Sequence, residues 1–131
     1  WRIAVDRPVM GSGTVDRVLE TVVSVQDRAI CTSGSYRKYR EQDGRRFSHT
    51  IDPATGWPAE NGLLSATVLA PTAAYADALA TAFMVLGAEQ TKGFLATYPN
   101  LGLDVLLMSD DGHGGYVVWA TPGFEAVSQP L

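Results

Sequence analysis

The chain has 131 residues, and 46% of them are hydrophobic, so it can bury the core of one domain. Ten Lys and Arg residues against fourteen Asp and Glu residues give a formal net charge of −4, which excludes the basic surface that nucleic-acid binding requires. Cys31 is the single cysteine, so no internal disulfide can form. The sequence starts with Trp1 rather than methionine, and we therefore expect it to be a piece of a longer protein.

The first 50 residues predict a series of strands. Short runs of alternating or β-branched side chains indicate them, and turn residues separate them. The last two form a hairpin, because the Asp43-Gly44 dipeptide between them suits a primed two-residue turn. A flexible connection is expected at residues 10–13, where two glycines stand. The predicted strands are residues 1–5, 18–25 and 29–32 and the pair 36–40 and 46–50.

Residues 48–58 predict a rigid loop with its polar groups held in place. Pro53 fixes its own φ and restricts Asp52 to extended conformations, while Gly56 permits a turn that other residues resist. His49 lies where the preceding strand meets this loop, and an imidazole titrates near neutrality, which suits proton transfer. The sequence is equally compatible with a structural His49 that bonds to a backbone carbonyl.

The second half of the sequence predicts a strand, two helices and a hairpin. Thr72 is a suitable N-cap for the first helix and Gly87 ends it, while Pro99 follows the second helix. This order of elements predicts an α+β fold, with an antiparallel-rich sheet and helices packed on one face. The strand is predicted at residues 63–69, before the first helix. The second helix is predicted at 88–97, and the hairpin strands follow at 103–108 and 116–120.

Asp77 and Thr81 stand four residues apart in the first predicted helix, so their side chains share one face. A carboxylate and a hydroxyl in otherwise apolar surroundings make a plausible pair of oxygen ligands for a hard cation such as Mg²⁺. The alternative is structural. In that case Asp77 is a first-turn carboxylate favoured by the helix dipole, and Thr81 bonds back to a carbonyl of the preceding turn.

Three motifs stand out in the sequence: Thr-Ser-Gly-Ser-Tyr at 32–36, His-Thr-Ile-Asp-Pro-Ala-Thr-Gly-Trp-Pro at 49–58 and Asp-Ala-Leu-Ala-Thr-Ala at 77–82. Taken together, they resemble motifs of the FAD:protein FMN transferase family, the ApbE-type flavin transferases formerly called thiamine-biosynthesis lipoproteins. The segments Trp1-Arg2-Ile3 and Gly123-Phe124 are also similar to segments of this family. The family's amino-terminal half has no counterpart here. The resemblance therefore implies that residues 1–131 are a single domain, the carboxy-terminal half of a larger flavin-transferase fold.

The resemblance also implies roles for individual residues. Asp77 and Thr81 would ligate Mg²⁺, which would bridge to the pyrophosphate of FAD. His49 would act as the base for an incoming hydroxyl. The residues implied to bind the flavin cofactor are His49, Ile51, Asp52, Thr55 and Gly56.

The activity implied is the Mg²⁺-dependent transfer of FMN from FAD to a threonine or serine hydroxyl of an acceptor flavoprotein, with release of AMP. If water enters instead, the same site would hydrolyse FAD to FMN and AMP. A third reading is an FAD-binding module that is inactive without its amino-terminal half. The expected partners are FAD, the acceptor protein and that missing half, and the family suggests an extracytoplasmic location, either periplasmic or anchored to the membrane.

Overall fold

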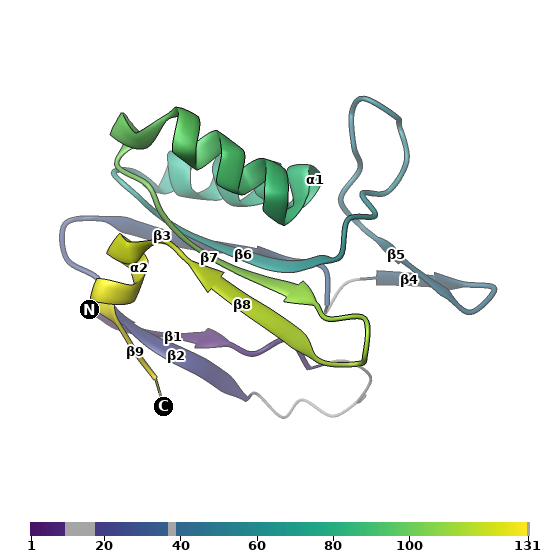
Figure 1. The fold of residues 1–131 in the computed structure, drawn as a ribbon, viewed down its shortest axis with the longest axis horizontal. Coiled ribbons are helices and arrows are strands. Elements are labelled where there is room, and N and C mark those ends of the chain that lie inside the picture. The colour runs from purple at the N-terminus through teal and green to yellow at the C-terminus, as the bar shows by residue number, and fades with distance from the viewer. Residues whose placement is uncertain (10–17, 37–38, 131) are drawn as a thin grey trace.

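The fold has three layers (Figure 1). In this computed structural model, residues 1–9, 18–36 and 39–130 are described. A long helix covers one face of a four-stranded sheet, a three-stranded sheet lies against the other face, and a two-stranded hairpin extends to the side. The elements are β1 Arg2–Asp6, β2 Leu19–Ser24, β3 Ala29–Gly34, β4 Tyr39–Gln42, β5 Arg45–Ser48, β6 Leu63–Ala70, α1 Ala73–Thr97, the 3₁₀ turn η1 Pro99–Leu101, β7 Asp104–Asp110, β8 Tyr116–Ala120, α2 Pro122–Val127 and β9 Ser128–Pro130.

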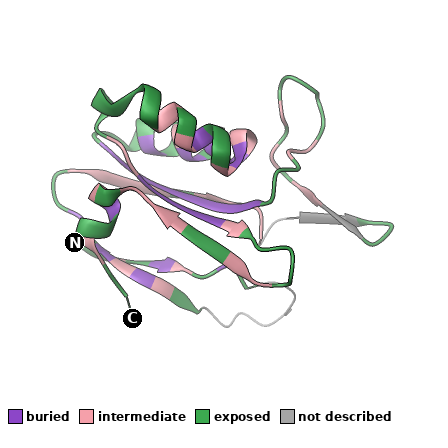
Figure 2. Ribbon diagram, in the orientation of Figure 1, coloured by how far each residue is buried: buried purple, intermediate pink, exposed green. Residues whose placement is uncertain are grey.

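The central sheet has the strand order β3-β6-β7-β8, and every neighbouring pair is antiparallel. All eight residues of β6 are buried, because protein covers both faces of this strand. Figure 2 shows the same pattern, with the burial concentrated in β6 and β7 and with β8 more exposed at the sheet edge. The predicted antiparallel-rich sheet with a helix on one face is therefore confirmed.

Two hydrophobic cores hold the layers together. The first lies between α1 and the central sheet, and it includes Phe83, Val68 and Leu107. The second lies between the central sheet and the sheet β1-β2-β9, and it includes Val23 and Phe124. The second core is the reason that both faces of β6 are apolar, which a single helical layer would not require.

The strands predicted at residues 18–25 and 29–32 are both present, but they belong to different sheets. β2 pairs with β1 and β9, whereas β3 pairs with β6. The chain changes sheets in the turn between them, where Asp27 has a φ of 53°. Sequence periodicity identifies the strands but carries no information about this change of partner.

Helix α1 begins and bends where the sequence predicts. The Thr72 side chain accepts a hydrogen bond from the backbone N–H of Tyr75, as an N-cap does. Gly87 has φ 78° and ψ 173°, so the two predicted helices are two halves of one helical run that is interrupted at this glycine. The side-chain amide of Asn61 donates to the carbonyls of Met84 at 2.9 Å and Val85 at 3.0 Å, which caps the first half.

The hairpin predicted around Asp43-Gly44 is present as β4 and β5. Both turn residues have positive φ, 53° for Asp43 and 75° for Gly44, as a type I′ turn requires. Residues 37–38 of this predicted hairpin and the connection predicted at 10–13 lie outside the described residues.

Two elements near the carboxyl end were not predicted. Thr121 caps the short helix α2 through a bond from the Phe124 backbone, and β9 then adds to the edge of β2. Phe124 packs into the second core, so α2 lies on the side of the central sheet opposite α1. No helix in the described part of the chain combines the length and apolar composition needed to cross a bilayer.

Candidate active site

A cavity of about 390 Å³ lies beside the free edge of β3 and brings together most of the polar motif residues. It joins the end of β1, the end of β3, the start of the loop after β5 and the middle of α1's first half. Two of the predicted site residues, His49 and Thr81, share this cavity although they are far apart in the sequence. The lining residues are Asp6, Thr32, Ser33, Gly34, Tyr36, His49, Thr50 and Thr81.

Strand β3 supplies side chains to both faces of its sheet at this point. The Thr32 hydroxyl lies 2.8 Å from that of Thr67 on β6, whereas Ser33 points to α1. At Gly34, a Cβ atom would lie 2.9 Å from the ring of Tyr36 and 3.2 Å from the carbonyl oxygen of Leu64. A glycine therefore lets the Tyr36 ring close against the strand.

On α1, the Thr81 hydroxyl donates to the backbone carbonyl of Asp77 at 3.1 Å. It also lies 3.2 Å from the hydroxyl of Ser33. The bond to a carbonyl one turn earlier is the one that the structural alternative predicts for Thr81.

The structural alternative for Asp77 is wrong, because α1 starts at Ala73 and has no acidic residue in its first turn. Asp77 lies in the second turn, where the helix dipole contributes little. Its carboxylate is exposed and, among the described residues, makes no hydrogen bond or ion pair. The local fold therefore gives Asp77 no structural partner.

Cys31 lies beneath the start of α1 on the same face of β3 as Ser33. Its thiol is 3.8 Å from the Ala73 carbonyl oxygen. Burial, and next the negative charge of Asp77, raise the pKa of the Cys31 thiol above its usual value. A raised pKa favours the protonated thiol, which agrees with Cys31 packing as a small side chain.

The cavity lies beside the first residues of the loop that follows β5, His49 and Thr50. His49 is exposed and is the first residue after β5, and the Thr50 backbone N–H is fixed by the Ser48 hydroxyl at 3.1 Å. The imidazole of His49 is therefore placed at the cavity by the end of the hairpin rather than by the tip of the loop.

The remainder of the loop projects from the sheets (Figure 1) and holds its shape through its own hydrogen bonds. The Asp52 carboxylate accepts from the Ala54 N–H at 2.9 Å, and the Thr55 hydroxyl accepts from the Trp57 N–H at 3.2 Å. Gly56 takes a φ of 73°, and the Asp52 N–H donates to the Trp57 carbonyl at 2.8 Å to close the loop. The turn at Gly56 is the one that the sequence predicts, and the hydrogen bonds of Asp52 and Thr55 add to it.

Four of the residues implied to bind the cofactor are not part of the cavity lining. Ile51, Asp52, Thr55 and Gly56 all lie in the projecting loop, and the Ile51 side chain is 51% exposed. Their part in cofactor binding stays a prediction.

Sequence reasoning missed several lining residues. Thr32, Ser33, Gly34 and Tyr36 belong to the Thr-Ser-Gly-Ser-Tyr motif, whose sequence alone indicates no role for its members. Asp6 has no local signal, because it reaches the cavity only through the pairing of β1 with β2.

The donor set at α1 suits a magnesium ion. Among the described residues, no group of three or more His, Cys, Asp or Glu side chains is arranged to hold a metal. Mg²⁺ does not require such a group, since it keeps several waters and commonly takes one or two protein oxygens together with substrate phosphates. An unpartnered carboxylate one helical turn from the Thr81 hydroxyl meets that requirement.

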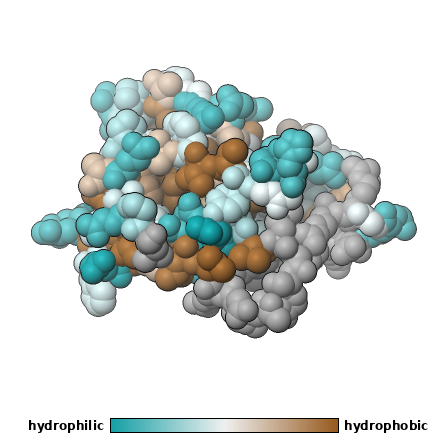
Figure 3. All heavy atoms as spheres, turned by 60° about the horizontal axis from the view of Figure 1, so that its bottom comes forward, coloured by the Kyte–Doolittle hydropathy of each residue, from teal (hydrophilic) through white to brown (hydrophobic). Residues whose placement is uncertain are grey.

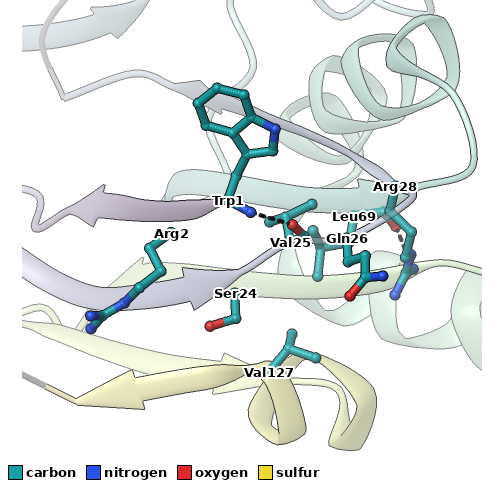
Figure 4. Close-up of a pocket in the computed structure, with 8 residues that line it drawn as sticks. All are labelled: Trp1, Arg2, Ser24, Val25, Gln26, Arg28, Leu69 and Val127. Carbon is teal, nitrogen blue, oxygen red and sulfur yellow. Dashed lines mark hydrogen bonds between the residues drawn. The ribbon is translucent and has the colours of Figure 1, made fainter.

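A second, larger hollow of about 550 Å³ lies at the other end of the molecule (Figure 4). Its lining contains no carboxylate and no imidazole. Arg28 is held by Asp104 at 2.6 Å and by the carbonyls of Leu69 and Gly102, and the Trp1 amino group donates to the Val25 carbonyl. Of these two hollows, the smaller one is therefore the one lined by a carboxylate and an imidazole, those of Asp6 and His49.

The sequence is similar to proteins of the ApbE family, and the curated relatives given below are FAD:protein FMN transferases. A sequence model of the ApbE family matches residues 1–107. The FAD:protein FMN transferase of Escherichia coli K12 is 41% identical over 126 residues, which are 96% of this chain and 34% of that protein. That of Treponema pallidum is 40% identical over 111 residues, 85% of this chain and 29% of that protein. The chain therefore spans about a third of the length of these curated relatives.

Solved structures agree with the sequence matches. The flavin transferase ApbE from Vibrio cholerae superposes with a TM-score of 0.76 at 37% identity, covering 97% of this chain and 37% of that one. The ApbE protein from Thermotoga maritima gives a TM-score of 0.73 at 32% identity, covering 98% of this chain and 38% of that one.

Proposed function

This chain belongs to the ApbE family, and we propose that it forms the carboxy-terminal part of an enzyme that transfers FMN from FAD to a threonine or serine hydroxyl of an acceptor protein, releasing AMP. The observation that supports this most directly is the cavity at β3. It places an exposed imidazole, that of His49, in the same hollow as Thr81, one helical turn from the unpartnered carboxylate of Asp77.

Asp77 and Thr81 are the residues that would hold Mg²⁺. Bound there, the ion would neutralise negative charge on the pyrophosphate oxygens of FAD. Asp77 offers an anionic oxygen, and Thr81 offers a lone pair of its hydroxyl oxygen while its O–H donates to the Asp77 backbone carbonyl. None of the described residues that line the cavity is a lysine or arginine, so none of them would compete with the ion for the same anions.

His49 would take the proton of the attacking hydroxyl at an imidazole nitrogen. The acceptor oxygen then forms a bond to the phosphorus of the FMN moiety, the bond from that phosphorus to the bridging oxygen breaks, and AMP leaves with that oxygen. An exposed His49 suits this step, because a protein acceptor must reach it from solvent.

The rest of the site would come from further polypeptide, which we take to be the missing amino-terminal half. A cavity of about 390 Å³ is near the lower end of the range for ligand pockets, so it can enclose only part of a dinucleotide. This chain also exposes apolar side chains on strand β8, where Val117 is 57% and Val118 45% exposed. Apolar patches are visible over the face seen in Figure 3, as expected of a surface that packs against more protein.

Hydrolysis of FAD to FMN and AMP is the second candidate activity. The openness of the site favours it, since His49 and Thr81 are both exposed and water could take the place of the acceptor hydroxyl. If catalysis needs the missing amino-terminal half, the 131-residue chain by itself should bind FAD without turning it over.

The test is to incubate the full-length protein with FAD, Mg²⁺ and an acceptor domain that carries a target threonine. We expect covalent flavin on the acceptor by in-gel fluorescence, and none when the target threonine is replaced by alanine. Chromatography of the same reactions separates FMN released by hydrolysis from transfer. FAD that is neither transferred nor hydrolysed in the presence of Mg²⁺ contradicts both activities. Running the 131-residue chain in parallel tests whether it needs the rest of the protein.

A further inference from the structure

The geometry points to Ser33 as a positioning residue that aims the Thr81 hydroxyl at the metal. This inference rests on the proposed function, since it concerns the same Mg²⁺ site. It starts from the 3.2 Å contact between the hydroxyl oxygens of Ser33 and Thr81, which links the end of β3 to α1 at the cavity.

The position of Ser33 follows from the alternation of β3. Thr32 turns to the opposite face of the sheet, where it meets Thr67, so Cys31 and Ser33 both face α1. Cys31 lies against Ala73 at the helix start, and Ser33 lies two residues further along the strand, against Thr81. The register of β3 against β6 fixes this arrangement by pairing Ser33 with Ala66.

Counting protons then assigns the direction of each bond. The Thr81 hydroxyl has one proton and two lone pairs. The Asp77 carbonyl can only accept, so the Thr81 proton points to it at 3.1 Å. Ser33 must then be the donor to Thr81, which occupies one of the two lone pairs.

The remaining lone pair of Thr81 is the one that can bind a cation. Two hydrogen bonds, one given to Asp77 and one received from Ser33, fix the rotation of the hydroxyl and therefore the direction of that lone pair. Groups that orient a metal ligand without touching the metal commonly change metal affinity by 10- to 100-fold when they are removed. Ser33 would act in this way.

A matched set of variants separates positioning from simple structural support. Ser33→Ala removes the donor, and Ser33→Thr keeps a hydroxyl at a strand position. Ser35→Ala is the control, because Ser35 lies in the same motif but its hydroxyl donates to the Leu63 carbonyl at 3.3 Å and is not part of the cavity lining. If Ser33→Ala does not fold, Ser33→Cys keeps the shape with a weaker donor and should give an intermediate loss.

The measurement is Mg²⁺ binding to the full-length protein by isothermal titration calorimetry, with FAD present and acceptor absent, together with thermal unfolding without metal. We expect Ser33→Ala to weaken Mg²⁺ binding about tenfold, Ser33→Thr to restore it, and Ser35→Ala to leave it unchanged. Wild-type Mg²⁺ affinity in Ser33→Ala contradicts the role of Ser33 but leaves the metal site standing. So does a loss of Mg²⁺ affinity that follows the unfolding temperature and also occurs in Ser35→Ala. Absence of Mg²⁺ binding in the wild-type protein overturns the metal site and this inference together.

Discussion

At the scale of single residues, the candidate site combines an exposed imidazole with a carboxylate that has no hydrogen-bond partner among the described residues. The Asp77 carboxylate makes no hydrogen bond or ion pair within the described chain, and His49 is exposed at the cavity. By contrast, the acidic and hydroxyl side chains of the loop, Asp52 and Thr55, are bonded to neighbouring backbone. This difference separates candidates for chemistry from residues that maintain shape.

Replacement of Asp77 by asparagine should abolish Mg²⁺-dependent turnover and leave the fold intact. The carboxylate has no structural partner and lies outside the first turn, so the free energy of unfolding should change by no more than about 0.5 kcal/mol. Loss of an anionic ligand should lower turnover by on the order of 100-fold or more. Steady-state rates against Mg²⁺ concentration test this, with Glu89→Gln, an exposed acid of the same helix, as the control. Full activity in the Asp77 variant would remove the metal assignment.

Replacement of His49 by alanine should slow the transfer step more than it weakens FAD binding. General-base catalysis typically contributes at least about 100-fold to a rate, whereas an exposed side chain contributes little to binding. Single-turnover rates and FAD titrations measure the two effects separately. His113, the other histidine, is exposed in the turn between β7 and β8, so His113→Ala is the matched control. A pure loss of FAD affinity would make His49 a binding residue instead of a base.

At the scale of elements, local signals predicted most of the strands and the ends of α1, and non-local contacts account for what was missed. The turn chemistry of Asp43-Gly44 and the cap at Thr72 are read from neighbouring residues, and the structure contains both. The assignment of β2 and β3 to different sheets depends on partners distant in the sequence. Helix α2 spans only six residues and is too short to show helical periodicity.

The same reasoning applies to the site. The sequence supplied His49, Asp77 and Thr81 as candidates, because their types and spacing carry chemical meaning. It could not supply Asp6 or the contact of Ser33 with Thr81, since both depend on how strands and helix pack.

The Gly123-Phe124 segment of α2 provides a test of packing at this scale. A Cβ atom at Gly123 would overlap the carboxylate of Asp104, which Arg28 and Thr121 hold in place. Gly123→Ala should therefore lower the free energy of unfolding by about 1–3 kcal/mol in chemical denaturation.

Gly93 is the control for that substitution. It lies in α1 with no atom near the position of an added Cβ, so Gly93→Ala should be neutral or stabilise by up to about 1 kcal/mol. Equal effects of the two substitutions would mean that Asp104 moves aside without cost.

At the scale of the whole molecule, a polar link joins the three-stranded sheet to the edge strand β8 of the central sheet. Glu20 on β2 accepts from the Tyr116 hydroxyl on β8 at 2.7 Å and from Arg7 at 3.0 Å. Burial, and next the hydrogen bond to Glu20, raise the pKa of Tyr116 above its usual value. The folded state therefore holds the phenol proton more tightly than the unfolded state does.

The sign of the pH dependence follows from this shift. A raised pKa in the folded state contributes stability that is complete below pH 10 and is lost as the pH rises through the folded value. Urea unfolding at pH 8 and above pH 10 should show a loss of stability in the wild-type protein that is smaller in Tyr116→Phe. An identical pH dependence in the two proteins would assign the alkaline loss to other groups.

The interruption of α1 at Gly87, with Asn61 closing the preceding turn, has a consequence for how this chain would tolerate an inserted residue. In a continuous helix, one added residue would rotate everything on the far side by about 100°. Here the helix is broken at Gly87, so the two halves need not rotate together. An alanine inserted after Ala88 should turn the side chains of Thr91 and Phe94 away from the core and lower the free energy of unfolding. The affinity for Mg²⁺ should not change, because Asp77 and Thr81 lie before the break. Calorimetry on such an insertion would show whether the half of the helix that carries Asp77 and Thr81 is insulated from changes in the other half.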